Sequence, residues 1–127
     1  MRPARSLQDL DGGPWPAPPA DSTRLVLTAH ALRRKPLRDL TPEDLRLLIN
    51  QGIGLPHLLP LALALLRTDP LTEGDLYPGD LLAAVLRCSP ALRQTHPDLA
   101  AELRTIVTAL TGLPPDLARA AAAFTAG

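Results

Sequence analysis

Aromatic side chains are nearly absent from this chain, which has one tryptophan, one tyrosine and one phenylalanine. β-Strands favour aromatic and β-branched residues, whereas the hydrophobic 46% of this sequence consists mainly of leucine and alanine, which favour helices. A length of 127 residues suffices for one domain with its own hydrophobic core. The sequence therefore predicts an all-α fold, a compact single-domain bundle of about five to six helices.

Cysteine and net charge are also scarce. Cys88 is the only cysteine and cannot form an intramolecular disulfide, which favours a reducing compartment. Thirteen basic residues balance thirteen acidic ones, so no overall field draws the protein to nucleic acid or to an anionic membrane. The basic start at Met1–Arg5 is followed by Gln8 and Asp9 rather than by an apolar stretch, unlike a secretory signal. We expect a cytoplasmic protein.

No hydrophobic run is long enough to cross a bilayer, which takes about 20 residues. The longest apolar stretch runs from Ile53 to Leu66 and is interrupted by Pro56, His57 and Pro60. We expect this stretch to be the buried central helix, with Pro56 in its first turn and Pro60 causing a kink or a delayed start.

Residues typical of catalysis or metal binding do not cluster. His30, His57 and His96 fall in separate predicted elements, and none has a second histidine three or four residues away. Cys88 carries no nucleophile signature and is expected to act as a small core residue. Gly52-Ile53-Gly54 lacks the lysine and the preceding strand of a phosphate loop and predicts a turn. We expect no catalytic residues, metal or cofactor; an enzyme is the last of three hypotheses.

Residues 1–20 are predicted to form a proline- and glycine-rich arm, in which Trp15 more often caps the core than contacts a partner. Residues 21–127 are predicted to form the helical domain. Its first helix starts at Asp21-Ser22, ends before Pro36 and carries an apolar face of Leu25, Val26, Ala29 and Leu32.

The other predicted helix starts carry a capping residue, a proline or an acid, each of which stabilises a helix N-terminus. The clearest is Thr41-Pro42-Glu43-Asp44, and that helix is expected to end at Gly52 in a left-handed cap. The others stand at Asp80, Ser89-Pro90, His96-Pro97-Asp98 and Pro114-Pro115-Asp116. The last, alanine-rich segment is helical if it docks on the domain.

The most distinctive segment is 69–80, where prolines, glycines and acids surround one tyrosine. It predicts a structured loop. Tyrosine is favoured at interface hot spots, and carboxylates complement a basic partner. Glu73, Asp75, Tyr77 and Asp80 are therefore candidate partner-binding residues, although acids in such loops also serve only to cap helices and to meet solvent.

A short basic cluster consists of Arg33, Arg34, Lys35 and Arg38 at a predicted helix C-terminus, where cations complement the helix dipole. It supports an alternative function, a helical adaptor or nucleic-acid-binding regulator. Such a binder usually shows a wider basic stripe or stacking aromatics. The neutral balance of this chain makes nucleic acid the less favoured partner.

Several blocks of sequence resemble one family, the contact-dependent growth inhibition (CDI) immunity proteins. The resemblance covers about residues 7–87, and its most specific parts are Gln51–Gly54 and Tyr77–Asp80. Asn50 replaces a glycine that the family prefers, and Leu76 replaces a frequent aromatic residue. The supporting blocks are Ser22–Val26, Leu32–Leu37, Leu40–Arg46, Ile49–Leu55 and Glu73–Leu82.

This resemblance implies a cytosolic antitoxin that binds a cognate toxin domain and blocks it stoichiometrically. Many such toxins are nucleases with basic active sites, for which an acidic surface would be complementary. The resemblance implies that the toxin domain is the partner of the candidate surface, which consists of Glu73, Asp75, Tyr77 and Asp80. We expect a monomer, and we expect neither membrane nor cofactor to be involved.

Overall fold

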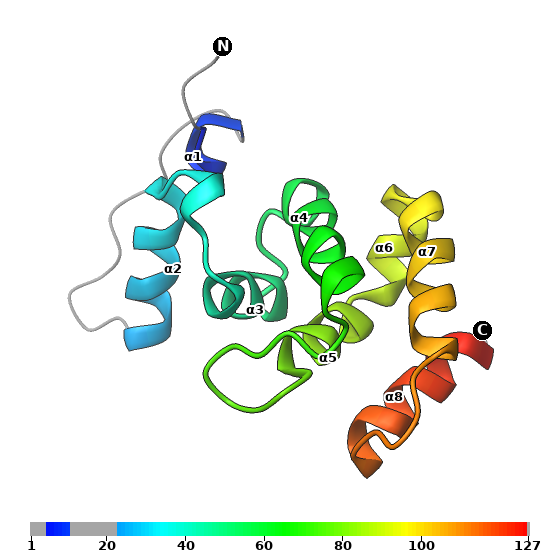
Figure 1. The fold of residues 1–127 in the computed structure, drawn as a ribbon. Coiled ribbons are helices and arrows are strands. Elements are labelled where there is room, and N and C mark those ends of the chain that lie inside the picture. The colour runs from blue at the N-terminus through cyan, green and yellow to red at the C-terminus, as the bar shows by residue number, and fades with distance from the viewer. Residues whose placement is uncertain (1–4, 11–22, 127) are drawn as a thin grey trace.

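The structure, a computed structural model, describes residues 5–10 and 23–126 (Figure 1). These residues form eight α-helices and one short 3-10 helix, with no strand beyond a single bridge. The elements are α1 (Leu7–Leu10), α2 (Arg24–Arg34), η1 (Leu37–Asp39), α3 (Pro42–Asn50), α4 (Leu55–Thr68), α5 (Asp80–Arg87), α6 (Ser89–Thr95), α7 (Pro97–Thr108) and α8 (Pro115–Ala126). The all-α prediction is confirmed.

The helix count of five to six was too low, partly because the predicted N-terminal arm contains a helix. Ser6 and Asp9 cap α1 reciprocally: the Asp9 N–H donates to Ser6 Oγ at 3.3 Å, and the Ser6 N–H donates to Asp9 Oδ2 at 3.0 Å. Leu7 is completely buried beside Gly54. Residues 7–10 thus belong to the bundle, while 11–22, with Trp15 and the predicted cap Asp21-Ser22, lie outside the described residues.

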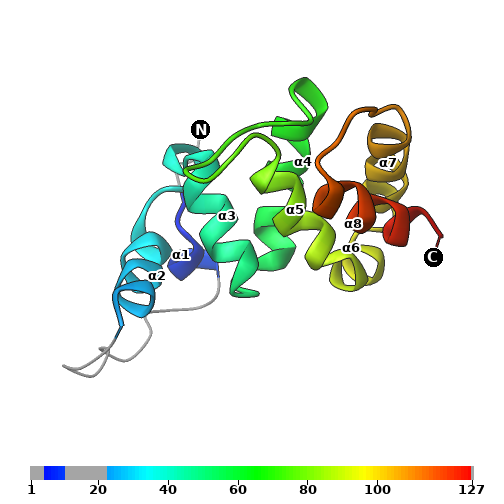
Figure 2. The same cartoon turned by 90° about the horizontal axis from the view of Figure 1, so that it is seen from below.

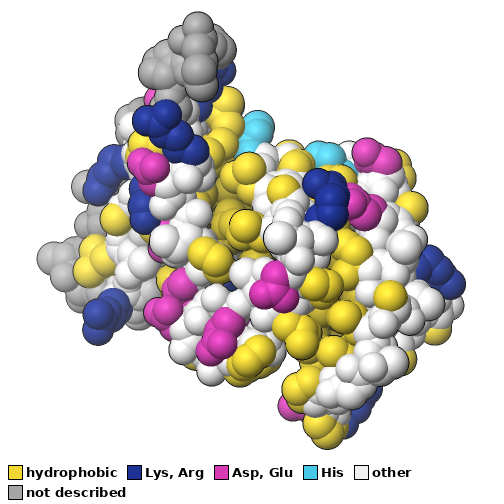
Figure 3. All heavy atoms as spheres, viewed as in Figure 1, with side chains coloured by type: hydrophobic (Ala, Val, Ile, Leu, Met, Phe, Trp, Pro, Cys, Tyr) yellow, Lys and Arg dark blue, Asp and Glu magenta, His cyan; other side chains and the backbone are white. Residues whose placement is uncertain are grey.

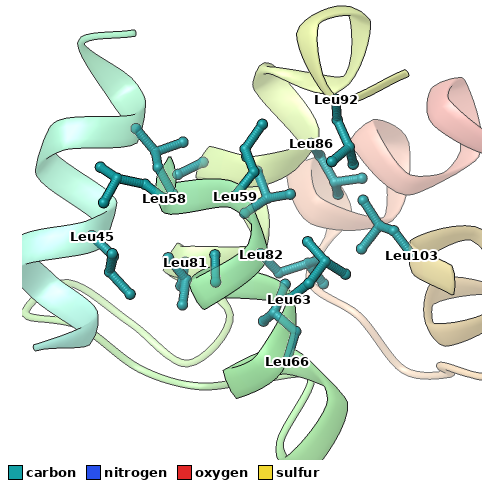
Figure 4. Packing of buried hydrophobic residues seen from close by; sticks show 14 of the residues in the cluster. Leu45, Leu58, Leu59, Leu63, Leu66, Leu81, Leu82, Leu86, Leu92 and Leu103 are labelled. Atoms are coloured by element: carbon teal, nitrogen blue, oxygen red, sulfur yellow. The ribbon is translucent and has the colours of Figure 1, made fainter. Parts of the chain in front are cut away.

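Leucines from α3, α4, α5, α6 and α7 meet in the hydrophobic core, with α4 in the middle (Figure 4). The nearly continuous apolar sequence of α4 gives it buried residues on several sides, as predicted for the central helix. Helix α4 begins at Leu55 and runs through Pro60, so the alternative of a delayed start was wrong. The completely buried residues of α4 are Leu58, Leu59, Ala62, Leu63 and Leu66.

Helix α2 differs from its predicted orientation. Ala29 and Leu32 are buried as expected, but Leu25 and Val26 are 39% and 40% exposed. Figure 1 shows α2 at one end of the molecule, where it contacts α1 and α3. Only the C-terminal half of α2 packs against the bundle. Helical spacing therefore predicted more buried residues in α2 than the structure has.

Local signals placed most of the other helices correctly. Thr41 and Asp44 form a capping box at the start of α3, and Gly52 has the left-handed φ of +71° after its end. The C-terminal segment docks as helix α8, which buries Leu117 and Phe124 and packs beside α5 and α7 (Figure 2). Among the described residues, no helix has the length and hydrophobicity needed to span a membrane.

Candidate functional site

The connection between α4 and α5 forms, together with Asp80 at the start of α5, a folded loop of residues 69–80, which we call the acidic loop. Its entry is a tight turn, where the Leu71 N–H donates to Asp69 Oδ1 at 3.1 Å. Glu73 and Pro78 form an antiparallel bridge, and the Gly79 N–H donates to the Leu71 carbonyl at 3.1 Å. The loop therefore closes on its own backbone, as the sequence predicted for a structured segment.

Asp80 holds this loop from inside. Its carboxylate accepts hydrogen bonds from the N–H groups of Gly74 at 2.6 Å, Leu76 at 3.0 Å and Tyr77 at 3.4 Å. The residue is only 2% exposed and stands in the first turn of α5, where the helix dipole favours an acid. Asp80 thus lies beneath the surface with which the sequence analysis had grouped it.

A second anchor comes from α3. Glu43 Oε1 accepts the Asp75 N–H at 2.8 Å, and the Glu43 carboxylate accepts two bonds from Arg46, of 2.7 and 2.5 Å. Arg46 Nε also lies 3.8 Å from Asp80 Oδ2. These bonds from Arg46 and from the Asp75 N–H lower the pKa of Glu43 against the opposing effect of burial.

Sequence reasoning had not linked Glu43 or Arg46 to the acidic loop. The acid in the first turn of α3 was explained by the helix dipole alone. The available signal was the spacing of Glu43 and Arg46, which places opposite charges together on one face of a helix. That spacing predicts their pairing, but not that Asp75, 32 residues further along, would donate to it.

The outward face of the acidic loop carries the other three predicted residues. Glu73 and Asp75 are exposed, and Tyr77 is 43% exposed. Leu76, which the sequence analysis did not select, is 62% exposed beside them. Figure 3 shows acidic side chains gathered over α3 and the acidic loop, with apolar side chains between them and the C-terminal helices. The structure thus places Glu73, Asp75 and Tyr77 on one exposed loop.

An open groove of about 1050 Å³ adjoins the acidic loop, between it, α5 and α6 on one side and α8 on the other. We call it the α5/α8 groove. Its lining is mainly apolar, with Arg87, Arg93 and Asp116 as its charged residues. The apolar lining includes Leu71, Tyr77, Pro78, Leu86, Leu117 and Phe124.

The basic cluster behind the alternative function does not form one exposed patch. Arg33 is buried, at 3% exposure, and Lys35 Nζ lies 2.7 Å from Asp44 Oδ2 in a salt bridge. Burial alone would raise the pKa of Asp44, but hydrogen bonds from Lys35 and Thr41 lower it. Arg38 is exposed and lies 4.0 Å from Asp39. Arg33 is therefore removed from any exposed basic surface, whereas Arg34 and Arg38 are exposed.

The cysteine has a partner in the core. Cys88 Sγ donates to the Ile49 carbonyl at 3.2 Å, and burial raises the pKa of the thiol. A raised pKa disfavours the thiolate, which is the nucleophilic form. In the parts of the chain that the structure covers, no group of three or more His, Cys, Asp or Glu side chains is placed to hold a metal ion.

The described residues thus form a small all-helical protein with a preorganised acidic loop whose outward face is exposed. The chain belongs to the CDI immunity proteins, because that family matches residues 9–103. The match includes the whole acidic loop, and it extends past Cys88 into α7, beyond the resemblance seen in the sequence. Helix α8 lies outside it. No curated protein matches the chain at a significant level.

Proposed function

We propose that this protein is a cytoplasmic antitoxin, which binds the toxin domain of a contact-dependent growth inhibition or related system and neutralises it without turnover. The observation that carries the proposal is the family match over residues 9–103, because an immunity protein needs a toxin as its partner. The cell that makes the toxin would keep this protein to protect itself.

The exposed face of the acidic loop is the surface we assign to the toxin. Tyr77 and Leu76 offer apolar area at the loop tip, and tyrosine is a frequent hot-spot residue. Glu73 and Asp75 supply negative charge, which suits a basic toxin surface and speeds association. We now assign Asp80 a positioning role, since its carboxylate is buried in bonds to the loop backbone.

Preorganisation is the physical advantage of this arrangement. Ordering a free loop on binding costs conformational free energy and weakens the complex. Here Asp80 and Glu43 already fix the N–H groups of Gly74, Asp75 and Leu76. The toxin would therefore meet a surface close to its bound shape.

The test is a calorimetric titration with the purified toxin domain encoded beside this chain's own gene, followed by an assay of the toxin's activity at increasing ratios of this protein. We expect one-to-one binding and complete inhibition at equivalence. Inhibition at ratios far below one would indicate turnover, and no binding would overturn the proposal.

Charge-matched variants locate the surface. The double substitution Glu73→Ala and Asp75→Ala removes two exposed carboxylates from the acidic loop, whereas Asp39→Ala with Asp98→Ala removes two from η1 and α7. Both variants have the same net charge. We expect the loop variant to weaken toxin binding at least tenfold and the control to change it little. Equal affinities would remove the acidic loop from the interface.

A further inference from the structure

We propose that the α5/α8 groove receives an apolar segment of the same toxin domain, with α8 as one wall of the site. This inference rests on the proposed function. It extends the contact surface from the acidic loop to a concave site beside it. The proposed occupant of this site is a toxin segment with protruding apolar side chains followed by a basic residue.

The groove is continuous with the acidic loop. Tyr77 and Pro78 belong to the exposed loop tip and also line the groove, together with Leu71 at the loop's start. A partner that covers Tyr77 therefore also covers the mouth of the groove. An interface that joins a projecting loop to a neighbouring pocket resembles known hot-spot arrangements, in which anchor side chains fill pockets at the centre of the contact.

The chemistry of the two regions specifies the occupant. Leu86 of α5 and Leu117 and Phe124 of α8 make the groove floor apolar, so apolar side chains would be stabilised there by losing contact with water. The charged residues of the groove itself are Arg87, Arg93 and Asp116, so a basic residue of the segment is favoured only outside it. There the exposed carboxylates Glu73 and Asp75 of the adjoining loop complement it. The matching toxin segment carries leucine-like anchors next to arginine or lysine.

Helix α8 supplies one wall of the groove and is firmly attached. Its Leu117 side chain packs close to Gly79, where a Cβ atom would lie 2.8 Å from Leu117 Cδ2. The Arg93 guanidinium of α6 lies 4.7 Å from the centre of the Phe124 ring and donates to the Phe124 carbonyl. These contacts join both ends of α8 to the rest of the bundle.

Helix α8 lies beyond the part of the chain that the family match covers. The family match ends at residue 103, so the acidic loop and α5 lie within the shared part, and α8 at 115–126 lies beyond it. Ala120 and Ala123 of α8 face the groove with small side chains. Larger residues at these two positions would fill the groove without changing the acidic loop.

Two neighbouring alanines provide a matched test. Ala123 is exposed and lines the groove, whereas Ala122 is exposed and lines a shallow depression between α7 and α8 instead. The affinity of the neighbouring toxin domain is measured for Ala123→Arg and Ala122→Arg in the full chain. We expect Ala123→Arg to weaken binding at least tenfold and Ala122→Arg to change it less than threefold.

Opposite-sign variants separate filling of the groove from a change of charge. Ala123→Glu and Ala122→Glu are compared in the same titration, and we expect Ala123→Glu also to weaken binding at least tenfold. If wild type binds the toxin but Ala123→Arg or Ala123→Glu binds as tightly as its control, the groove inference is wrong while the antitoxin function stands. If wild type does not bind, the antitoxin proposal itself fails.

Discussion

The Arg93 side chain of α6 joins the last helix to the rest of the bundle through Phe124. Its guanidinium lies 4.7 Å from the Phe124 ring centre and also donates to the Phe124 backbone carbonyl, near the C-terminal end of α8. Cations are favourable at helix C-termini, and cation–π contacts add to the effect. This one side chain thus stabilises a helix that the family match does not include.

Replacing Arg93 by alanine should therefore loosen α8. We expect the free energy of unfolding to fall by about 1–3 kcal/mol, since a charged hydrogen bond and a cation–π contact are both lost. Urea denaturation followed by circular dichroism measures the loss. Arg104→Ala, which removes an exposed arginine from α7, is the control and should cost less than about 0.5 kcal/mol. Equal losses would mean that Arg93 does not attach α8.

The positioning role of Asp80 predicts a local effect on the acidic loop. Asp80→Asn keeps the shape, but its NH2 group replaces one of the two oxygens that accept the three N–H bonds and cannot accept a bond itself. We expect faster hydrogen exchange at Gly74 and Leu76, together with weaker toxin binding. Asp75→Asn, at an exposed position, should leave these exchange rates unchanged. Unchanged exchange in Asp80→Asn would contradict the role.

The ion pair of Glu43 with Arg46 should make stability depend on acid pH. The pKa of Glu43 lies below its ordinary value of 4.5 in the folded state, chiefly through the hydrogen bonds from Arg46. Its contribution is therefore complete above pH 4.5 and disappears as the pH falls through the lower folded pKa. Glu43→Gln should be less stable at neutral pH and should lose less on acidification. Urea unfolding of wild type and of Glu43→Gln at neutral and acid pH tests this. An equal fall in the free energy of unfolding of both proteins on acidification would refute it.

Gly79 should tolerate alanine worse than another left-handed glycine does. Its φ is +91°, and an added Cβ would lie 2.8 Å from Leu117 Cδ2. Gly112 has a φ of +68° with open space around it, so Gly112→Ala reports the backbone strain alone. We expect both variants to be less stable than wild type in urea denaturation. Gly79→Ala should lose at least about 1 kcal/mol more of the free energy of unfolding than Gly112→Ala, because Leu117 must also move. Equal losses would show that Leu117 adapts freely.

Local chemistry predicted much of the fold because each signal lies within a few residues. Thr41, Pro42 and Asp44 specify a helix start on their own, and Gly52 specifies its end. The apolar run of α4 likewise predicted a buried helix. The same approach failed for Leu25 and Val26, because helical spacing cannot show whether a neighbour covers the first turn of α2.

The candidate site was only partly predictable for the same reason. Composition singled out the loop around Tyr77, but an acid that caps the loop from inside and an acid that faces solvent look alike in the sequence. Only the folding of the loop around Asp80, whose carboxylate accepts three of its N–H groups, separates Asp80 from the exposed Asp75. The α5/α8 groove depends on contacts between segments more than 30 residues apart, such as Arg93 with Phe124. No local pattern encodes it.

Asp80 and Glu43 fix the backbone of the acidic loop from beneath, while Glu73, Asp75 and Tyr77 project outward. Substitutions at the outward positions would therefore change the surface that we propose for toxin binding without dismantling the loop. An antitoxin facing a changing toxin would gain from such a division, since new specificities could be sampled one side chain at a time. If the loop binds the toxin as proposed, the same division makes it a practical scaffold for laboratory libraries that redirect it to other toxins.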